Sequence, residues 1–329
     1  MERYCVVGMG SIAQRHVQNL RSLHPESEIL SVSASGRNRI RPEGADRVVT
    51  LDEALQLPIC YGIIASPAPF HTTGATAFLN AAVPVLIEKP LSANWKEAVA
   101  WSEENLIPEK PLVRIGYCLR FLSTAGMVRD VLANGRLGAL LNISSFVGQY
   151  LPGWRSNADY RNSVSASETL GGGALLELSH ELDLLNWFIG DLEVSHSWLR
   201  AHMLLDLDVE ECADLVLTTP AGCRVDVHMD FWQKDAIRRM EFFGTKGRMF
   251  WNLMSNTIEI SQPGCATEIL YGSEDQRGDI YVSMLRAFEA GIAGANGAVD
   301  LRLTTVEQAL LVLRQIEKAK EINAWRRSN

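Results

Sequence analysis

The chain has 329 residues, of which 47% are hydrophobic and 21% charged, and its formal net charge is −8. This length suggests about two domains, and the composition supports a full globular core. The acidic balance argues against a nucleic-acid binder, which normally carries a basic face.

The first expected elements are a strand and a helix joined by a glycine-rich turn. Residues 4–7 form an apolar run typical of a buried parallel strand, and a helical pattern follows over residues 12–23. The turn between them fits G-x-G-x-x-A, in which Gly8 permits the sharp turn, Gly10 lets a pyrophosphate approach the backbone, and Ala13 keeps the helix close to the sheet. A plain tight turn is the alternative. The residues expected to contact a dinucleotide at this helix N-terminus are Gly8, Gly10, Ser11, Ile12 and Ala13.

A second strand is expected over residues 28–34. The acidic residue that usually follows this strand and binds the ribose of NAD is missing, and Ser35 and Arg37 stand there with Arg41 close behind. A hydroxyl and guanidinium groups suit a 2′-phosphate, so the sequence favours NADP(H) over NAD(H). A solvated basic loop is the alternative.

Further strands and helices alternate along the first part of the chain. They are expected over residues 46–57 (a short strand and a helix), 61–65, 72–82, 85–87, 95–105 and 112–116. This alternation predicts a doubly wound, Rossmann-type parallel sheet.

The ends of two of these strands should line the cofactor crevice, because ligands of open α/β sheets bind beyond the carboxyl ends of strands. Ser66, Pro67 and His71 follow one strand, and Glu88 and Lys89 follow the next. We expect the first three residues and Glu88 to lie against the cofactor. His71 is more typical of a helix start or a packing position than of a catalyst.

Six motifs occur in order along nearly the whole chain. They are the G-x-G-x-x-A turn, the A-S-P-x-x-x-H loop, the E-K-P strand end, and segments 116–121, 171–183 and 243–247. Together they resemble the glucose–fructose oxidoreductase / inositol dehydrogenase (Gfo/Idh/MocA) family. The resemblance implies a dinucleotide-binding Rossmann domain over residues 1–121. It also implies a substrate-binding and oligomerisation α/β domain over residues 122–329, with a large, mostly antiparallel open sheet that builds homodimers or homotetramers.

The second half of the sequence is compatible with such a sheet. Alternating or apolar runs, mostly separated by turn residues, cover residues 141–146, 194–199, 213–219, 224–231, 240–243, 249–251 and 257–261. A long amphipathic helix is expected over residues 304–324.

Lys89 is the first catalytic candidate, since it stands at the carboxyl end of a strand. In the family, the matching lysine contacts the reacting hydroxyl near the nicotinamide. Partial burial and the cofactor would lower its pKa toward about 7–8, where acid–base work is efficient. A structural lysine is the alternative.

His180 and Glu177 are the other catalytic candidates. A helical pattern over residues 174–188 places Glu177, His180 and Asp183 on one face, at spacings of three. An imidazole can accept the alcohol proton as hydride leaves, and a carboxylate would orient it. In the commoner family pattern, an Asp stands four residues before the histidine. This sequence departs from that pattern, since a Glu stands three residues before His180. The departure weakens the case for Glu177 more than the case for His180. Ordinary polar pairs on a helix are the alternative.

The irregular segment over residues 148–173 is expected to face the substrate, since Trp and Tyr stack on sugar rings and Arg binds carboxylate or phosphate. The sequence resembles family members that act on bacterial surface-polysaccharide sugars and sialic-acid-like nonulosonates. An aromatic-rich loop packed on the sheet is the alternative. The substrate-binding candidates are Arg120, Trp154, Arg155, Tyr160 and Arg161.

These observations lead to three hypotheses of function. The first is an NAD(P)-dependent oxidoreductase that transfers hydride between the nicotinamide and a secondary alcohol or ketone of a sugar, sugar nucleotide or sialic-acid-like substrate. The second is a redox-neutral enzyme with tightly held nucleotide, and the third is a non-catalytic NADP-sensing binding protein.

The remaining features suggest a cytoplasmic protein with a small-molecule substrate. The six cysteines show no metal-ligand spacing, and no metal site is expected. Because the N-terminus runs directly into the first expected strand, no signal peptide is expected. Pro and Gly interrupt the uncharged stretch of residues 54–87, so neither a membrane span nor a membrane partner is expected.

Overall fold

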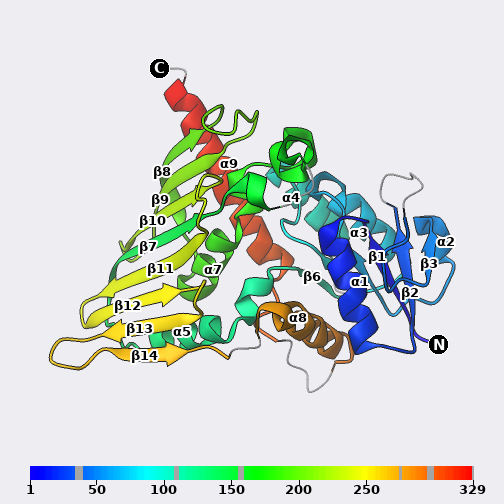
Figure 1. Ribbon diagram of the computed structural model, residues 1–329, viewed down its shortest axis with the longest axis horizontal. Coiled ribbons are helices and arrows are strands. Elements are labelled where there is room, and N and C mark those ends of the chain that lie inside the picture. The colour runs from blue at the N-terminus through cyan, green and yellow to red at the C-terminus, as the bar shows by residue number, and fades with distance from the viewer. Residues whose placement is uncertain (34–39, 107–110, 155–158, 274–275, 295–299, 328–329) are drawn as a thin grey trace. The chain divides into compact units, whose positions relative to one another are not determined.

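The structure, a computed structural model, describes residues 1–33, 40–106, 111–154, 159–273, 276–294 and 300–327 (Figure 1). The chain forms two compact units, the first of residues 1–118 and 278–310 and the second of residues 119–277 and 311–329. This division differs from the predicted domains 1–121 and 122–329 because a late segment, 278–310, belongs to the first unit.

The first unit is built on a parallel six-stranded sheet, which confirms the doubly wound prediction (Figure 1). The strand order is β3-β2-β1-β4-β5-β6. The strands are β1 (Arg3–Val7), β2 (Glu28–Val32), β3 (Arg47–Val49), β4 (Tyr61–Ile64), β5 (Val85–Ile87) and β6 (Val113–Ile115). The helices are α1 (Ser11–Leu23), α2 (Leu51–Leu55), α3 (His71–Asn80), α4 (Trp95–Asn105) and most of α8 (Gln276–Ile292). The order reverses between β1 and β4, the place where such sheets bind dinucleotides.

Residues 278–310 join the first unit through α8 and the segment that follows it. The hydroxyl of Tyr61 on β4 donates to Glu289 of α8 at 2.8 Å, and the rings of Tyr61 and Phe288 meet edge to face. Thr304 forms a backbone bridge with Ile115 at the end of β6. These contacts join residues far apart in the sequence, which is why local patterns did not reveal them.

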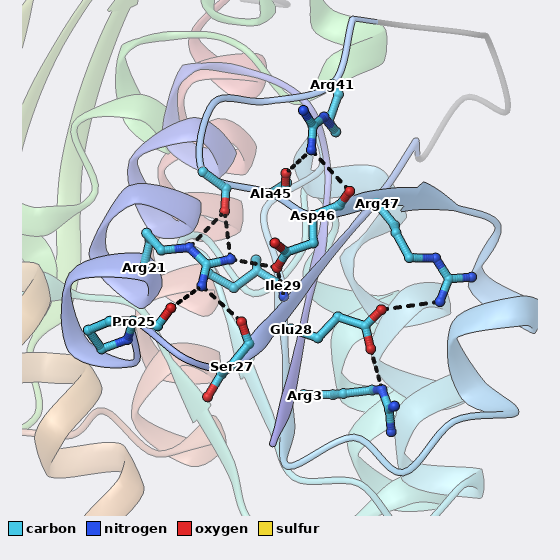
Figure 2. A network of polar contacts seen from close by, with 11 residues as sticks. Arg3, Arg21, Pro25, Ser27, Glu28, Ile29, Arg41, Ala45, Asp46 and Arg47 are labelled. Atoms are coloured by element: carbon cyan, nitrogen blue, oxygen red, sulfur yellow. Dashed lines mark hydrogen bonds and ion pairs between the residues drawn. The ribbon is translucent and has the colours of Figure 1, made fainter. Parts of the chain in front are cut away.

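An arginine on α1 holds the chain that leads into β3 (Figure 2). Arg21 donates to the carbonyls of Pro25 and Ser27 at 2.7 and 2.9 Å and to Asp46 at 2.5 Å. The Asp46 carboxylate also accepts from the backbone N–H of Ile29 at 2.7 Å. The network ties α1, β2 and the residues just before β3 together at the edge of the sheet.

The second unit carries an eight-stranded sheet in the order β14-β13-β12-β11-β7-β10-β9-β8, which confirms the predicted large, mostly antiparallel sheet. Only the β7–β10 pair is parallel among the pairings of this sheet in the described residues. The strands are β7 (Leu140–Gly148), β8 (Glu193–Arg200), β9 (Cys212–Thr218), β10 (Arg224–Asp230), β11 (Ile237–Gly244), β12 (Gly247–Asn252), β13 (Thr257–Ser261) and β14 (Glu268–Tyr271).

One face of this sheet is packed against helices of the same unit. The helices are α5 (Ser123–Ala133), α6 (Ala174–Glu177), α7 (His180–Ile189) and most of α9 (Val306–Arg327). Phe188 of α7 meets Phe242 and Trp251 of the sheet edge to face, and Asn323 of α9 accepts from the backbone of Leu199 on β8. The inward residues of the strands and these helices form the core of the second unit.

The segment predicted to be irregular consists of short 3₁₀ turns in its described part, at Leu151–Gly153, Tyr160–Asn162, Val164–Ala166 and Glu168–Leu170. Across the chain as far as it is described, no helix combines the length and the apolar character that crossing a bilayer requires.

Candidate active site

The glycine turn after β1 fits a bound diphosphate. Gly8 has φ +128°, and a β-carbon there would lie 2.3 Å from the carbonyl oxygen of Ala65, so only glycine is accommodated. Gly10 is the N-cap of α1, which has no side-chain cap, and a β-carbon there would meet nothing within 4 Å. The helix N-terminus is therefore open to an anionic group from the side of Gly10.

His71 joins the two loops that follow β4 and β5. Its ring is buried, with Nδ1 2.8 Å from the carbonyl of Pro90 and Nε2 2.6 Å from the carbonyl of Ser66. Burial lowers the pKa of His71, although both carbonyls act in the opposite direction. Through these two contacts, His71 holds the loop after β4 to the loop after β5.

Glu88 is buried beneath the loop that carries Lys89. Its Oε1 lies 2.7 Å from Nε2 of His16 on α1, and its Oε2 accepts from the backbone N–H of Lys89 at 3.2 Å. The Glu88 carboxylate thus fixes the start of this loop against α1, the helix that follows the glycine turn. His16 was not predicted as a site residue, although a histidine three residues after Ala13 on the apolar face of α1 was a signal for it.

Lys89 lies two residues beyond the end of β5, at the same edge of the sheet as the glycine turn after β1. Only β4 separates the two strands. The first unit therefore brings the glycine turn and the residue Lys89 to one edge of one sheet.

The predicted continuous helix over residues 174–188 is wrong, because it is interrupted before His180. Helix α6 ends at Glu177 and α7 begins at His180. The hydroxyl of Ser179 donates to the carbonyl of Leu176 at 2.9 Å, a type of bond that bends helices. Glu177 and His180 consequently lie on two different helices.

Two carboxylates of the first turn of α7 bind arginines. Asp183 accepts from Nε and Nη2 of Arg120 at 2.9 and 2.7 Å, and both side chains are 1% exposed. Glu181 accepts from Nε and Nη2 of Arg238 at 2.7 and 2.8 Å. Arg120, predicted to bind substrate, is thus buried with its guanidinium turned to Asp183.

The other substrate-binding candidates lie in or next to the 3₁₀ segment. Trp154 packs edge to face on Phe231, and the hydroxyl of Tyr160 donates to the carbonyl of Leu205 at 3.3 Å. The guanidinium of Arg161 is largely exposed and stacks over the Tyr160 ring at 4.9 Å. Three predicted residues, Ser35, Arg37 and Arg155, lie outside the described residues.

A separate charged cluster lies on the less buried face of the second sheet. His228 is held between Asp214 (2.6 Å) and Asp230 (2.8 Å), and Arg200 donates to Asp214 and to the sulfur of Cys212. Burial lowers the pKa of His228, but the two carboxylates outweigh it and raise that pKa to about 9. Although Cys212, Asp214 and His228 have metal-ligand spacing, two cationic groups already balance the two carboxylates there, so we propose no metal site.

Comparison with known families identifies the family to which the chain belongs. Residues 2–113 match a model described as an oxidoreductase family with an NAD-binding Rossmann fold, and residues 126–250 match the GFO/IDH/MocA C-terminal domain. The chain belongs to the GFO/IDH/MocA family. This confirms the resemblance that the six sequence motifs carried, and the family is one of oxidoreductases.

Curated relatives within this family are dehydrogenases by name. Inositol 2-dehydrogenase 2 of Saccharopolyspora erythraea is 26% identical over 236 residues, which cover 68% of this chain and 65% of that protein. Inositol 2-dehydrogenase of Corynebacterium glutamicum (strain ATCC 13032) is 22% identical over 236 residues, covering 69% and 66%. The matches thus span slightly less than two thirds of these relatives.

Solved structures share the fold across almost the whole chain. Levoglucosan dehydrogenase in complex with NADH and levoglucosan has a TM-score of 0.82 at 15% identity, covering 98% of this chain and 97% of that one. An inositol dehydrogenase homolog from Azotobacter vinelandii with NAD⁺ has 0.80 at 16% (98% and 95%). The WlbA dehydrogenase of Bordetella pertussis with NADH and UDP-GlcNAcA has 0.75 at 18% (98% and 96%).

Proposed function

We propose that this GFO/IDH/MocA protein is an NAD(P)-dependent oxidoreductase that transfers hydride between the nicotinamide and a CH–OH carbon of a sugar or polyol. The observation that carries the proposal is the pairing of an open, uncapped glycine turn after β1 with Lys89 after β5 at the same sheet edge. Membership of an oxidoreductase family and the names of the relatives support it.

The residues proposed for the chemistry handle the proton and leave the hydride to the cofactor. When bound, the nicotinamide takes or gives the hydride. In the oxidation direction, the Lys89 ammonium donates to the substrate oxygen, and the His180 imidazole accepts the hydroxyl proton as the C–H bond breaks. Glu177 remains a third candidate, which would support the charged form of an imidazole.

Side chains of the second unit support a narrower proposal for the substrate class. Trp154, Tyr160 and Arg161 provide aromatic faces and a cation, groups that suit a sugar ring bearing a carboxylate or phosphate. A sugar nucleotide or a sialic-acid-like nonulosonate is therefore the finer proposal. The named ligands of the structural neighbours, which include levoglucosan, myo-inositol and UDP-GlcNAcA, supply the simplest test panel.

NADP(H) is proposed as the preferred cofactor. Strand β2 ends at Val32, and the sequence of residues 33–42 contains neither Asp nor Glu, so it lacks the acidic residue that usually follows this strand and binds the ribose of NAD. The neighbours named above carry NADH or NAD⁺, which makes the direct comparison necessary. A larger rise in melting temperature with NADPH than with NADH at equal concentration supports the proposal, and the reverse order refutes it.

We also propose that the protein forms a homodimer or homotetramer through the second sheet. We propose the cytoplasm as its location. The less buried face of this sheet carries the stacked Phe146 and His228 rings and Trp198, whose side chain is well exposed. Light scattering of the purified protein tests this assembly, and a monomer at micromolar concentration would refute it.

The activity itself is tested by absorbance of the reduced cofactor with NAD⁺ and NADP⁺ against the panel of polyols, sugars and sugar nucleotides. Substrate-dependent reduction that is lost in Lys89→Met and His180→Gln supports the proposal. Co-purified nucleotide with product formation but no net absorbance change would favour a redox-neutral enzyme. Cofactor binding without turnover of any panel member would favour an NADP-sensing protein.

A further inference from the structure

We propose that Arg120 and Arg238 are positioning residues that fix the direction of the His180 side chain by binding the two carboxylates beside it. The inference rests on the catalytic role proposed for His180, and it concerns only the second unit. Its basis is the juxtaposition of two bidentate ion pairs, Arg120–Asp183 and Arg238–Glu181, with the first residue of α7.

The start of α7 lacks the usual means of fixing a helix N-terminus. Its N-cap, Ser179, has helical backbone angles (φ −61°, ψ −9°) and makes no side-chain cap bond to α7. The hydroxyl of Ser179 instead donates backward to Leu176. Because His180 directly follows this bend, its direction depends on what holds the first turn of α7.

The two carboxylates leave the helix on opposite sides of His180. At 3.6 residues per turn, Glu181 lies about 100° from His180 around the axis and Asp183 about 60° in the other direction. Pinning both carboxylates therefore prevents rotation of the first turn either way. A single ion pair on one side would not do this.

The two arginines come from separate elements, so the first turn is tied at two points. Arg120 lies in the short 3₁₀ helix Cys118–Phe121, and Arg238 lies on β11. Arg120 is itself held, since its guanidinium lies 5.5 Å from the ring centre of Trp187, one further residue of α7. Each guanidinium uses two N–H groups on one carboxylate, a geometry that fixes angle as well as distance.

A contribution to the stability of the fold is a weak explanation for buried arginine–carboxylate pairs. Replacing a buried ion pair with apolar residues of similar size is often neutral or stabilising, because the charges lose their hydration when they are buried. Breaking only one partner is, by contrast, strongly destabilising. This asymmetry separates a structural role from a positioning role, because an apolar replacement keeps the packing and loses the angular constraint.

The experiment compares the double variant Arg120→Met/Asp183→Leu with the wild-type protein in three measurements. They are the melting temperature, the ring signals of His180 in protein carrying ¹³C-labelled histidine, and turnover with the substrate that the panel identifies. The chain has 7 histidines, and His180→Gln assigns the signal. Arg136→Met/Glu268→Gln removes a partly exposed ion pair between the loop that follows α5 and strand β14, and it is the control.

The proposal predicts that the double variant melts within a few degrees of the wild type but shows displaced or broadened His180 signals and kcat lower by about 10- to 100-fold. The control should leave all three measurements unchanged. Wild-type His180 signals in a folded double variant would overturn the proposal. Because these signals do not depend on turnover, displaced signals in a protein without dehydrogenase activity would refute the proposed function and leave the positioning role standing.

A second variant keeps the inference testable where the double variant does not fold. Arg238→Lys retains the positive charge at a site with 21% side-chain exposure but cannot form the two-pronged contact with Glu181. The proposal predicts shifted His180 signals and a several-fold lower kcat in this variant, with unchanged KM for the cofactor. Unchanged His180 signals would overturn it.

Discussion

The imidazole of His16 and the carboxylate of Glu88 meet at 2.7 Å in the interior of the first unit. His16 lies on the helix that follows the glycine turn, and Glu88 precedes Lys89 and accepts from its backbone N–H. The contact therefore couples the helix proposed to hold the diphosphate to the loop proposed to present the ammonium group.

Removing the donor of this pair should be costly. His16→Ala leaves the Glu88 carboxylate buried without its histidine partner, and we expect the free energy of unfolding to fall by about 2–4 kcal/mol. Urea unfolding measures this loss. His16→Gln, which retains an N–H donor, should lose clearly less. Wild-type stability in His16→Ala would show that the pair contributes nothing.

The same substitution should destabilise the protein much more at Gly8 than at Gly10. Gly8→Ala places a β-carbon 2.3 Å from the carbonyl of Ala65 at a positive φ, so we expect a loss of about 3 kcal/mol or more in stability. Gly10→Ala adds a methyl group in open space and should cost about 1 kcal/mol or less. Its cofactor affinity should nevertheless fall about tenfold or more, because the methyl group obstructs approach to the backbone. Denaturant unfolding and fluorescence titration with NADPH separate the two effects, and equal stability losses would contradict this account.

Substitution of the proposed catalytic residues should remove turnover and leave the cofactor site usable. Lys89→Met and His180→Gln are each expected to lower kcat by about 10²- to 10⁴-fold, the usual contribution of a positioned acid or base. The thermal shift produced by NADPH should persist in both variants. Full turnover in either variant would remove that residue from the mechanism.

Stability should depend on pH through His228. Its pKa is about 9 in the folded protein against about 6.5 in the unfolded chain, so the folded state binds the proton more tightly. The resulting stabilisation is complete below about pH 6.5 and is lost as the pH rises through about 9. We expect a loss of about 2–3 kcal/mol between pH 6.5 and 9.5.

Urea unfolding at several pH values tests this dependence. His228→Gln should flatten the decline, whereas His196→Gln, an exposed histidine on β8, should keep it. An unchanged decline in His228→Gln would assign the pH dependence to other groups.

Local patterns were sufficient to predict much of the fold. The apolar run before Gly8 and the alternation that follows it predict the parallel sheet, because both depend on neighbours in the sequence. Helix α8 was not predicted at all, and its place in the first unit depends on the contact of Glu289 with Tyr61, which lies far away in the chain. The parallel pairing of β7 and β10 is likewise non-local.

The sequence predicts the position of a candidate residue well where a motif fixes the backbone. It predicts less well where the direction of a side chain depends on a partner far away in the sequence. Lys89 follows the end of β5 and Gly10 is the N-cap of α1, as their motifs predict, while the functional roles of both residues stay predictions. Arg120 was predicted to face a substrate, but a guanidinium on its own carries no information about which carboxylate it will find, and Asp183 is 63 residues away. The bend before His180 depends on the backward bond of Ser179, which competes with a regular helix pattern.

The most direct test is a fluorescence titration of NADPH and NADH into the wild-type protein and into Gly10→Val. The central claim is that the dinucleotide is held by bare backbone at Gly10 and the N-terminus of α1. The claim predicts saturable binding to the wild type and loss of that binding in a variant that still unfolds cooperatively. Absence of binding of either nucleotide to the wild type, or undiminished binding to folded Gly10→Val, would contradict it.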